Sequence, residues 1–304
     1  MKILLTGATG FLGSKILKRL IKEKHQVAVL KRSTSSLRRI QEYMAVCSIY
    51  DADREGLDTV FEKEHPEIII HCATAYGRNA KETEQVAETN LMFGIRLLTL
   101  AEKYRCRYFI NTGTFAFKQI EPEGRIEKPI YMADYTLAKY QFIRWGEAFA
   151  VRGTLCFITM DLEHIFGEDD EEGKFILMIE QKCMSGEASV DLSDGMQLRD
   201  YIYTENVVDA YMCVLQHIKE CRGFCRFQVG MGEPIALKDF VIMIKNISES
   251  SIRLEFGKRE RNDNEPEASV ADINALKALG WQPRFSREEG IRQMLRRDKQ
   301  AGRI

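Results

Sequence analysis

Tyr135 and Lys139 are the two residues whose types and spacing most directly suggest chemistry. They stand four apart in "YTLAKYQF", so they share one face if this stretch is helical. An ammonium beside a phenol stabilises the phenolate and lowers the phenol pKa from about 10. A tyrosine tuned in this way can serve as a general acid or base near neutral pH. The same spacing also occurs in ordinary amphipathic helices, so its meaning depends on the rest of the chain.

Three glycines near the start of the chain form a second pattern. Gly7, Gly10 and Gly13 follow the apolar run "KILLTG" and open the amphipathic stretch "GFLGSKILKRLIKE". In a strand–turn–helix unit, such glycines allow the tight turn, the approach of a pyrophosphate and the packing of helix on strand. The amides around Phe11 and Leu12, at the helix start, would face the phosphates. This pattern predicts a dinucleotide cofactor.

The end of the second apolar run bears on which dinucleotide is bound. An acidic residue there would bind the ribose 2′-hydroxyl of NAD, but this chain has Lys31, Arg32 and Ser33. A basic pair followed by a hydroxyl suits a 2′-phosphate, although the same residues could form a solvated loop. We therefore expect NADP (as NADPH), with NAD the less favoured alternative. Asp51, followed by Ala52 at the end of the third run, is a candidate contact for the adenine amino group.

The bulk composition excludes several classes of protein. The 304 residues are 45% hydrophobic and carry a formal net charge of −1, which provides no global field for nucleic acid or an anionic membrane. The eight cysteines include no CxxC pair and none at a zinc spacing from a histidine, so we expect free thiols and no metal site. No signal peptide is evident, and no apolar run approaches the ~20 residues of a membrane span. The expected protein is soluble and cytoplasmic.

The order of the predicted elements indicates the fold class. Short apolar runs alternate with longer stretches of helical period through the first half, which is typical of a parallel sheet with helices on both faces. We predict a doubly wound α/β Rossmann domain over residues 1–163, to which 198–229 returns. Residues 164–304 would then form mainly a smaller C-terminal substrate-binding lobe. The acidic run 168–172, "EDDEE", lacks a metal-ligand pattern and is expected to be a solvated loop.

Taken together, these motifs resemble a known enzyme family along essentially the whole chain. The chain is similar to extended short-chain dehydrogenases/reductases of the nucleotide-sugar epimerase/dehydratase type, and within them to the CDP-abequose synthase group. The stretches that carry this resemblance are the glycine turn, "IIHCATAYGR", "ETNLMFGIRLL", "NTGTFAF", the Tyr135–Lys139 pair, "MDLEHIFGEDDEEGKF", "GMQLRDYIYTENVVDAY", "VGMGEPIALKDF", "LEFGKRERNDNEPEASVADI" and "DINALKALGWQP".

The resemblance implies reduction of a sugar 4-keto group by NADPH. The substrate would be a nucleotide-linked 4-keto-6-deoxyhexose, in deoxysugar biosynthesis for a surface polysaccharide such as O-antigen. Tyr135 would protonate the developing alkoxide, and Lys139 would hold the nicotinamide ribose and tune the phenol. The family uses a serine or threonine to polarise the sugar oxygen, for which Thr114 is the first choice and Thr112 the reserve. Phe115 and Ala116 follow Thr114, where related dehydratases have Asp-Glu, so water elimination is not expected.

The resemblance also implies binding residues elsewhere in the chain. Asn90 would support the lysine, and a homodimer would form through the helices 82–104 and 133–151. Either Arg259 or Arg261 could reach the diphosphate of the substrate, and we choose Arg261. The remaining expected contacts are Cys72, Ala73, Thr74 and Thr112 for the cofactor, and Tyr76, Arg78, His164, Lys174, Phe175 and Arg199 for the substrate.

Two rival functions remain open. One is a 4-epimerase that keeps NAD tightly bound and both oxidises and reduces C4. The other is a non-catalytic dinucleotide-binding sensor, although such proteins usually lose the tyrosine or the lysine, and this chain has both.

Overall fold

The computed structural model describes the chain except residues 78–81, 121–129, 131, 154, 263 and 304. The chain divides into two compact units. Unit 1 comprises Met1–Asp161 and Tyr211–Phe227, and unit 2 comprises Leu162–Ala210 and Gln228–Ile304. The assignment of one unit to the dinucleotide and the other mainly to the substrate stays a prediction.

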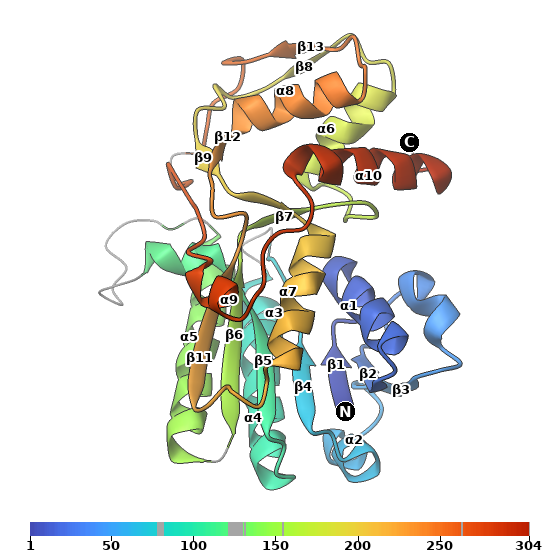
Figure 1. The fold of residues 1–304 in the computed structure, drawn as a ribbon, viewed down its shortest axis with the longest axis vertical. Coiled ribbons are helices and arrows are strands. Elements are labelled where there is room, and N and C mark those ends of the chain that lie inside the picture. The colour runs from blue at the N-terminus through green and yellow to red at the C-terminus, as the bar shows by residue number, and fades with distance from the viewer. Residues whose placement is uncertain (78–81, 121–129, 131, 154, 263, 304) are drawn as a thin grey trace. The chain divides into compact units, whose positions relative to one another are not determined.

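A seven-stranded parallel sheet forms the centre of unit 1, with the strand order β11-β6-β5-β4-β1-β2-β3 (Figure 1). This arrangement confirms the predicted Rossmann fold. The strands form because their apolar residues are covered on both faces, so that β4 is buried along its whole length. The strands of the sheet are β1 Lys2–Thr6, β2 Gln26–Lys31, β3 Ser48–Asp51, β4 Ile68–His71, β5 Tyr108–Thr114, β6 Cys156–Leu162 and β11 Phe224–Val229.

Helices flank this sheet, and the most regular of them carry an apolar stripe that faces it. Where α4 and α5 cover the sheet, Phe109, Phe142 and Phe157 pack together, with ring centroids 5.5–5.8 Å apart. Gly94 of α4 and Gly146 of α5 leave room for these rings. The helical segments of unit 1 are α1 Phe11–Lys22, the 3₁₀ turn η1 Arg38–Tyr43, α2 Leu57–Glu64, α3 Thr83–Ala87, the π-turn η3 Glu88–Met92, α4 Phe93–Lys103, the 3₁₀ turn η4 Phe115–Gln119 and α5 Ala133–Arg152; α7 Thr204–Gln216 ends in it.

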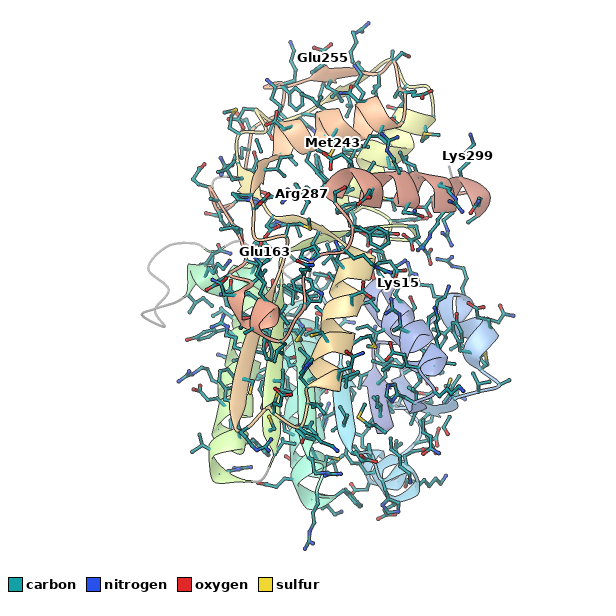
Figure 2. All side chains as sticks on the ribbon, viewed as in Figure 1. Lys15, Glu163, Met243, Glu255, Arg287 and Lys299 are labelled. Atoms are coloured by element: carbon teal, nitrogen blue, oxygen red, sulfur yellow. The ribbon has the colours of Figure 1, made fainter. Side chains whose placement is uncertain are left out.

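Unit 2 is built from helices and two-stranded pairs around a core of its own. Tyr201 and Phe240 stack with ring centroids 4.0 Å apart, and Phe166 packs edge-on against Phe240. Met243 on α8 borders this core, and Arg287 begins α10 (Figure 2). The elements are α6 Phe175–Met184, α8 Leu237–Ile247, α9 Asn274–Ala278, α10 Arg287–Gln300, and the pairs β7 His164–Phe166 with β10 Tyr201–Tyr203, β8 Ser189–Asp191 with β13 Arg253–Glu255, and β9 Leu198–Arg199 with β12 Ile235–Ala236.

The acidic run 168–172 differs from the solvated loop expected from the sequence. Glu168 is buried, accepts a hydrogen bond from the Tyr203 hydroxyl at 2.9 Å and pairs with Arg297 at 2.7 Å. Asp169 pairs with Arg303 at 3.4 Å. The expectation was wrong because α10 and the residues after it, more than a hundred positions away, supply the basic partners.

Two features are absent from the described part of the chain. No helix there is long and apolar enough to cross a membrane. No group of three or more His, Cys, Asp or Glu side chains among those residues could hold a metal ion.

Candidate active site

The glycine turn between β1 and α1 has the geometry of a phosphate cradle. Gly7 has φ +72°, and a Cβ there would lie 2.5 Å from the backbone nitrogen of Ala73. A Cβ on Gly13 would lie 2.1 Å from the Gly7 carbonyl oxygen, which explains the close packing of helix on turn. Gly10 is the N-cap of α1 and supplies no side-chain hydrogen bond. The amides of the first turn, at Phe11 and Leu12, can therefore bind an anion, and this site fits a dinucleotide.

The ends of β2 and β3 bring the predicted ribose residues together. Asp51 accepts hydrogen bonds from Lys31 Nζ at 3.1 Å and from Ser33 Oγ at 2.8 Å. Burial acts to raise the pKa of Asp51, but the hydrogen bonds from Ser33 and Lys31 hold it below its usual value. The Ala52 amide donates to the Lys31 carbonyl at 2.8 Å. Lys31 is thus already paired with a carboxylate.

Two arginines follow β2, and one of them contacts the glycine turn. The Arg32 side chain is exposed, and its amide donates to Ser35 Oγ at 3.2 Å. Arg39 of η1 donates to the Thr9 carbonyl within the turn at 3.4 Å. Arg39 was not among the sequence-predicted residues. The sequence signal for Arg39 is the basic run "LRR" that follows the loop after β2.

The loop after β4 is fastened by Asn90. The Asn90 side chain is buried and accepts from the Ala75 amide at 2.9 Å and from the Thr74 hydroxyl at 3.1 Å. Its amide donates to the Ala75 carbonyl at 2.7 Å. Asn90 therefore holds residues 74–75, and its expected support of Lys139, through the backbone of its helix or a water, stays a prediction. The π-turn η3 presents this side chain within what the sequence suggested was one continuous helix.

Tyr135 and Lys139 lie together on the buried face of α5. The Lys139 Nζ lies 5.8 Å from the Tyr135 ring centroid and donates to the Thr112 carbonyl at 2.7 Å. Tyr76 stacks on Tyr135 with ring centroids 5.2 Å apart. This face of α5 therefore joins the helix to the loop after β4 and to the end of β5.

The pKa values of this pair differ from the sequence expectation. Burial, followed by the neighbouring Tyr76, raises the pKa of Tyr135, although hydrogen bonds with Thr114 and Thr74 act to lower it. Burial lowers the pKa of Lys139 to about 8, although Cys72 and Asp161 act to raise it. The sequence predicts a lowered phenol pKa, whereas the Tyr135 pKa is raised, with burial as the largest cause. A neutral phenol is the form that donates a proton.

The two candidate threonines on β5 have different partners. Thr114 is buried and hydrogen-bonds with Tyr135, and its hydroxyl also accepts from the Ala116 amide at 3.3 Å. The Thr112 hydroxyl instead lies 2.7 Å from the Tyr211 hydroxyl and donates to Cys72 Sγ at 3.2 Å. The geometry therefore brings the first-choice threonine to the tyrosine, while the reserve contributes its carbonyl to Lys139.

Gly113, between these threonines, lies against a carboxylate that the sequence analysis missed. A Cβ at this position would lie 2.0 Å from Asp161 Oδ1. Asp161 accepts from Thr159 Oγ1 at 2.9 Å and from Arg226 Nε at 2.5 Å. The available signal was one acidic residue inside the apolar run "LCFITMDLE".

In unit 2, two predicted substrate arginines are paired with glutamates. Arg199 is buried and lies 2.9 Å from Glu265 Oε1. Arg261 donates to Glu267 Oε2 at 2.9 Å and to two backbone carbonyls of residues 265–266. His164 lies 3.5 Å from a Glu163 oxygen. These side chains are held within the unit by acids.

A pocket of unit 2 brings other predicted residues together. It has a volume of about 560 Å³ and is open to the surface. Lys174 is the N-cap of α6 and directly precedes the pocket residue Phe175. Arg261 does not line the pocket, whereas Arg259 does; Arg78 lies outside the described residues. The lining consists of Phe175, Asp191, Leu192, Ser193, Arg259 and Glu260.

Comparison with known proteins gives consistent relatives. Residues 3–230 match the model of the NAD dependent epimerase/dehydratase family. The chain is 32% identical to the CDP-abequose synthase of Salmonella typhimurium over 301 residues, which covers 97% of each protein.

Solved structures share the fold. The UDP-glucose 4-epimerase of Thermotoga maritima, solved with UDP-glucose, aligns with a TM-score of 0.86 at 24% identity, covering 99% of each chain. The UDP-glucose 4-epimerase of Thermus thermophilus, solved with NAD, gives 0.83 at 21% identity, covering 99% of this chain and 100% of that one. The family match spans the glycine turn, Thr114, Tyr135 and Lys139, and the chain belongs to the NAD dependent epimerase/dehydratase family.

Proposed function

We propose that this protein reduces the C4 keto group of a nucleotide-diphospho-4-keto-6-deoxyhexose with NADPH, in deoxysugar biosynthesis for a surface polysaccharide. The observation that carries the proposal is the hydrogen bonding of Thr114 with a buried, neutral Tyr135, directly before Phe115 and Ala116. The site has a proton donor but lacks the adjacent carboxylate pair that elimination would need. The likeness to CDP-abequose synthase supports a nucleotide-sugar substrate.

In the proposed mechanism, this chain's residues handle the proton while the bound dinucleotide supplies the hydride. Tyr135 donates its phenolic proton to the C4 oxygen as negative charge develops there. Thr114 donates a hydrogen bond to the same oxygen and orients the carbonyl. Lys139, fixed by the Thr112 carbonyl, presents an ammonium to the ribose and to the phenolate that remains. Tyr76, stacked on Tyr135, excludes water from the phenol.

The cofactor preference rests on the basic residues near the ribose position. The exposed Arg32, together with Arg39 beside the glycine turn, offers guanidinium groups suited to a 2′-phosphate. Phe175 and Arg259 in the pocket of unit 2 are proposed to stack on the base and contact the diphosphate of the substrate. The predicted roles of Arg199, Arg261 and His164 require ligands that displace their present acidic partners.

The test is a matrix of substrates and cofactors. CDP-, dTDP-, GDP- and UDP-linked 4-keto-6-deoxy sugars are incubated with NADPH or NADH, oxidation is followed at 340 nm, and the product configuration at C4 is determined by NMR. The proposal expects one nucleotide series to be reduced, faster with NADPH. Absence of turnover in all eight combinations, with a folded protein, contradicts it.

A 4-epimerase with NAD is the second candidate. The observation that favours it is the Lys31–Asp51 pair, because it places a carboxylate near the ribose position and reduces the positive charge there. The fold is also shared with several 4-epimerases. Release of NAD from the purified protein, together with interconversion of C4 epimers without added cofactor, would establish this alternative and exclude the reductase.

We also propose that the chain forms a homodimer through α3–α4 and α5. Met92 and Trp145 lie on these segments and are 43% and 45% exposed, which is unusual for such large apolar side chains. Trp145→Lys is expected to shift the protein from dimer to monomer in sedimentation experiments.

A further inference from the structure

Asp161 has no place in the mechanism above, although its carboxylate lies beside the candidate threonines. It is 3% exposed and belongs to β6, next to β5 in the sheet. Its Oδ1 occupies the space into which a side chain at position 113 would project. A side chain larger than that of glycine at position 113 would overlap the Asp161 carboxylate.

The Asp161 carboxylate has a cation and a hydroxyl as partners. Burying a lone carboxylate is costly, so such groups are paired or neutralised. Arg226 of β11 donates to Oδ2, while Thr159 donates to Oδ1 and itself accepts from Asn111 Nδ2 at 3.2 Å. Oδ2 thus faces the arginine, and Oδ1 faces Gly113, which lies on β5 between Thr112 and Thr114.

The other groups that face Lys139 are neutral. Burial, followed by Lys139 itself, lowers the pKa of His71 to about 3, so that imidazole is uncharged. Burial raises the pKa of the Cys72 thiol to about 11 and also raises the pKa of Tyr211. Tyr135 is neutral for the same reason, and β5 contributes only the Thr112 carbonyl. Asp161 acts to raise the Lys139 pKa, and its carboxylate lies against Gly113, the residue next to the Thr112 carbonyl that Lys139 binds.

We propose that Asp161, anchored by Arg226, is a positioning residue that supplies the negative charge opposite Lys139 and fills the space beside Gly113. It contacts neither the sugar carbonyl nor the dinucleotide; it acts through Lys139 and through the backbone of β5. The inference rests on the proposed catalytic role of Lys139, but its electrostatic part can be measured without turnover.

The primary experiment measures the pH titration of Lys139 in the unsubstituted protein and in the Asp161→Asn variant. Lysines are labelled with ¹³C at Cε, and the Lys139 signal is assigned by its loss in Lys139→Arg. The expected result is that Asp161→Asn lowers the Lys139 midpoint by about one pH unit, since an opposite charge nearby favours the charged form. An unchanged midpoint overturns the proposal. The control is Asp58→Asn, whose partner is the exposed Lys103 and which should leave Lys139 unaffected.

The activity profile separates this inference from the proposed function. If a substrate is found, the alkaline limb of kcat/KM in Asp161→Asn should move to lower pH together with the Lys139 midpoint. If Asp161 had a purely structural role, Asp161→Asn would lower kcat/KM at every pH and leave the midpoint of the alkaline limb unchanged. If no substrate is turned over but the midpoint moves, the proposed function fails and the role of Asp161 stands.

The shared volume is tested by a double-variant cycle in thermal unfolding. Gly113→Ser alone should lower Tm, because the new side chain meets Asp161 Oδ1. The double variant Gly113→Ser/Asp161→Ala should lose markedly less in Tm than the sum of the losses in the two single variants. Additive effects would contradict a common space. If Asp161→Asn does not fold, this double variant is used for the Lys139 titration instead.

Discussion

Four candidate site residues of the two units differ in their main partners. In unit 1, Asn90 and Lys139 are buried and bonded mainly to backbone atoms of neighbouring segments. In unit 2, Arg199 and Arg261 are paired with glutamate side chains. A backbone partner is fixed by the fold, whereas a carboxylate partner can be exchanged for a phosphate or a carboxylate of a ligand. We therefore expect unit 1 to hold the reacting groups in place and unit 2 to exchange its acidic partners for those of a ligand.

This contrast predicts that substitutions in the two units change different kinetic constants. Changes to buried groups of unit 1 should lower kcat, because they remove interactions with the reacting atoms. Changes to surface groups of unit 2 should raise KM for the nucleotide sugar and leave kcat nearly unchanged.

The largest expected effect is that of Tyr135→Phe. Removing the proton donor should lower kcat by roughly 10³-fold, within the range for a general acid, while KM and Tm change little. Stopped-flow or steady-state assays with the best substrate of the matrix measure this. Tyr140→Phe, on the same helix, is the matched control and should retain activity. Full activity in Tyr135→Phe would contradict the proposed role of this tyrosine as the proton donor.

Phe175→Ala tests the other half of the comparison. Loss of a stacking surface for a base typically costs about 1–3 kcal/mol, so KM for the nucleotide sugar should rise by about tenfold with kcat within about twofold. Met196→Ala, another exposed apolar side chain of unit 2, serves as the control. A fall in kcat without a change in KM would contradict the binding role.

Arg32→Ala tests whether an exposed cation of unit 1 binds the 2′-phosphate of NADPH. Because this cation is exposed, its contribution should be near 1 kcal/mol, so KM for NADPH should rise by about fivefold. KM for NADH should not change. Lys24→Ala, which removes an exposed charge before the other end of β2, is the control. Equal effects on both cofactors would argue against a 2′-phosphate contact.

The smallest expected effect concerns Glu180, a buried glutamate of unit 2. Neither carboxyl oxygen of Glu180 has a hydrogen-bond partner among the described residues. Burial, followed by the charges of Asp298 and Glu168, raises the pKa of Glu180 to about 8. The folded state thus binds this proton more tightly than the unfolded chain, whose glutamate has a pKa near 4.3. The resulting stabilisation is complete at low pH and is lost as pH rises towards about 8.

Glu180→Gln should remove this dependence. The amide stays neutral, so the variant should melt at a higher temperature than the parent at pH 8, by a few degrees, and the advantage should shrink at pH 5. Differential scanning calorimetry at both pH values provides the measurement, with the exposed Glu187→Gln as control. A Tm difference that is the same at both pH values would refute the assignment.

The sequence predicted the features that depend on short spacings. Gly7, Gly10 and Gly13 lie within seven residues, and Tyr135 and Lys139 lie within one helical turn, so the local pattern defined their geometry. The alternation of apolar runs was likewise enough to predict the parallel sheet, because each strand is short and buried on both faces.

The features that sequence reasoning missed depend on distant partners or on burial. Asp161 and Arg226 are 65 positions apart, and Glu168 and Arg297 are 129 apart, so no local pattern joins them. The pKa of Tyr135 was expected to be lowered by the lysine, but it is raised, and burial is the largest cause. Burial of this kind becomes visible only when the packing of α5 on its neighbours is known.

The π-turn Glu88–Met92 carries a consequence for insertions and deletions. A π-turn accommodates one residue more than a regular α-helix in the same length, and each helical residue corresponds to about 100° of rotation. Deleting one residue within this turn would regularise the helix and rotate α3 relative to α4 by that angle. Either the Asn90 amide would leave the 74–75 loop, or Thr83 would lose its hydrogen bond to Asp134 at 2.6 Å. The length of this segment is therefore constrained as tightly as its composition.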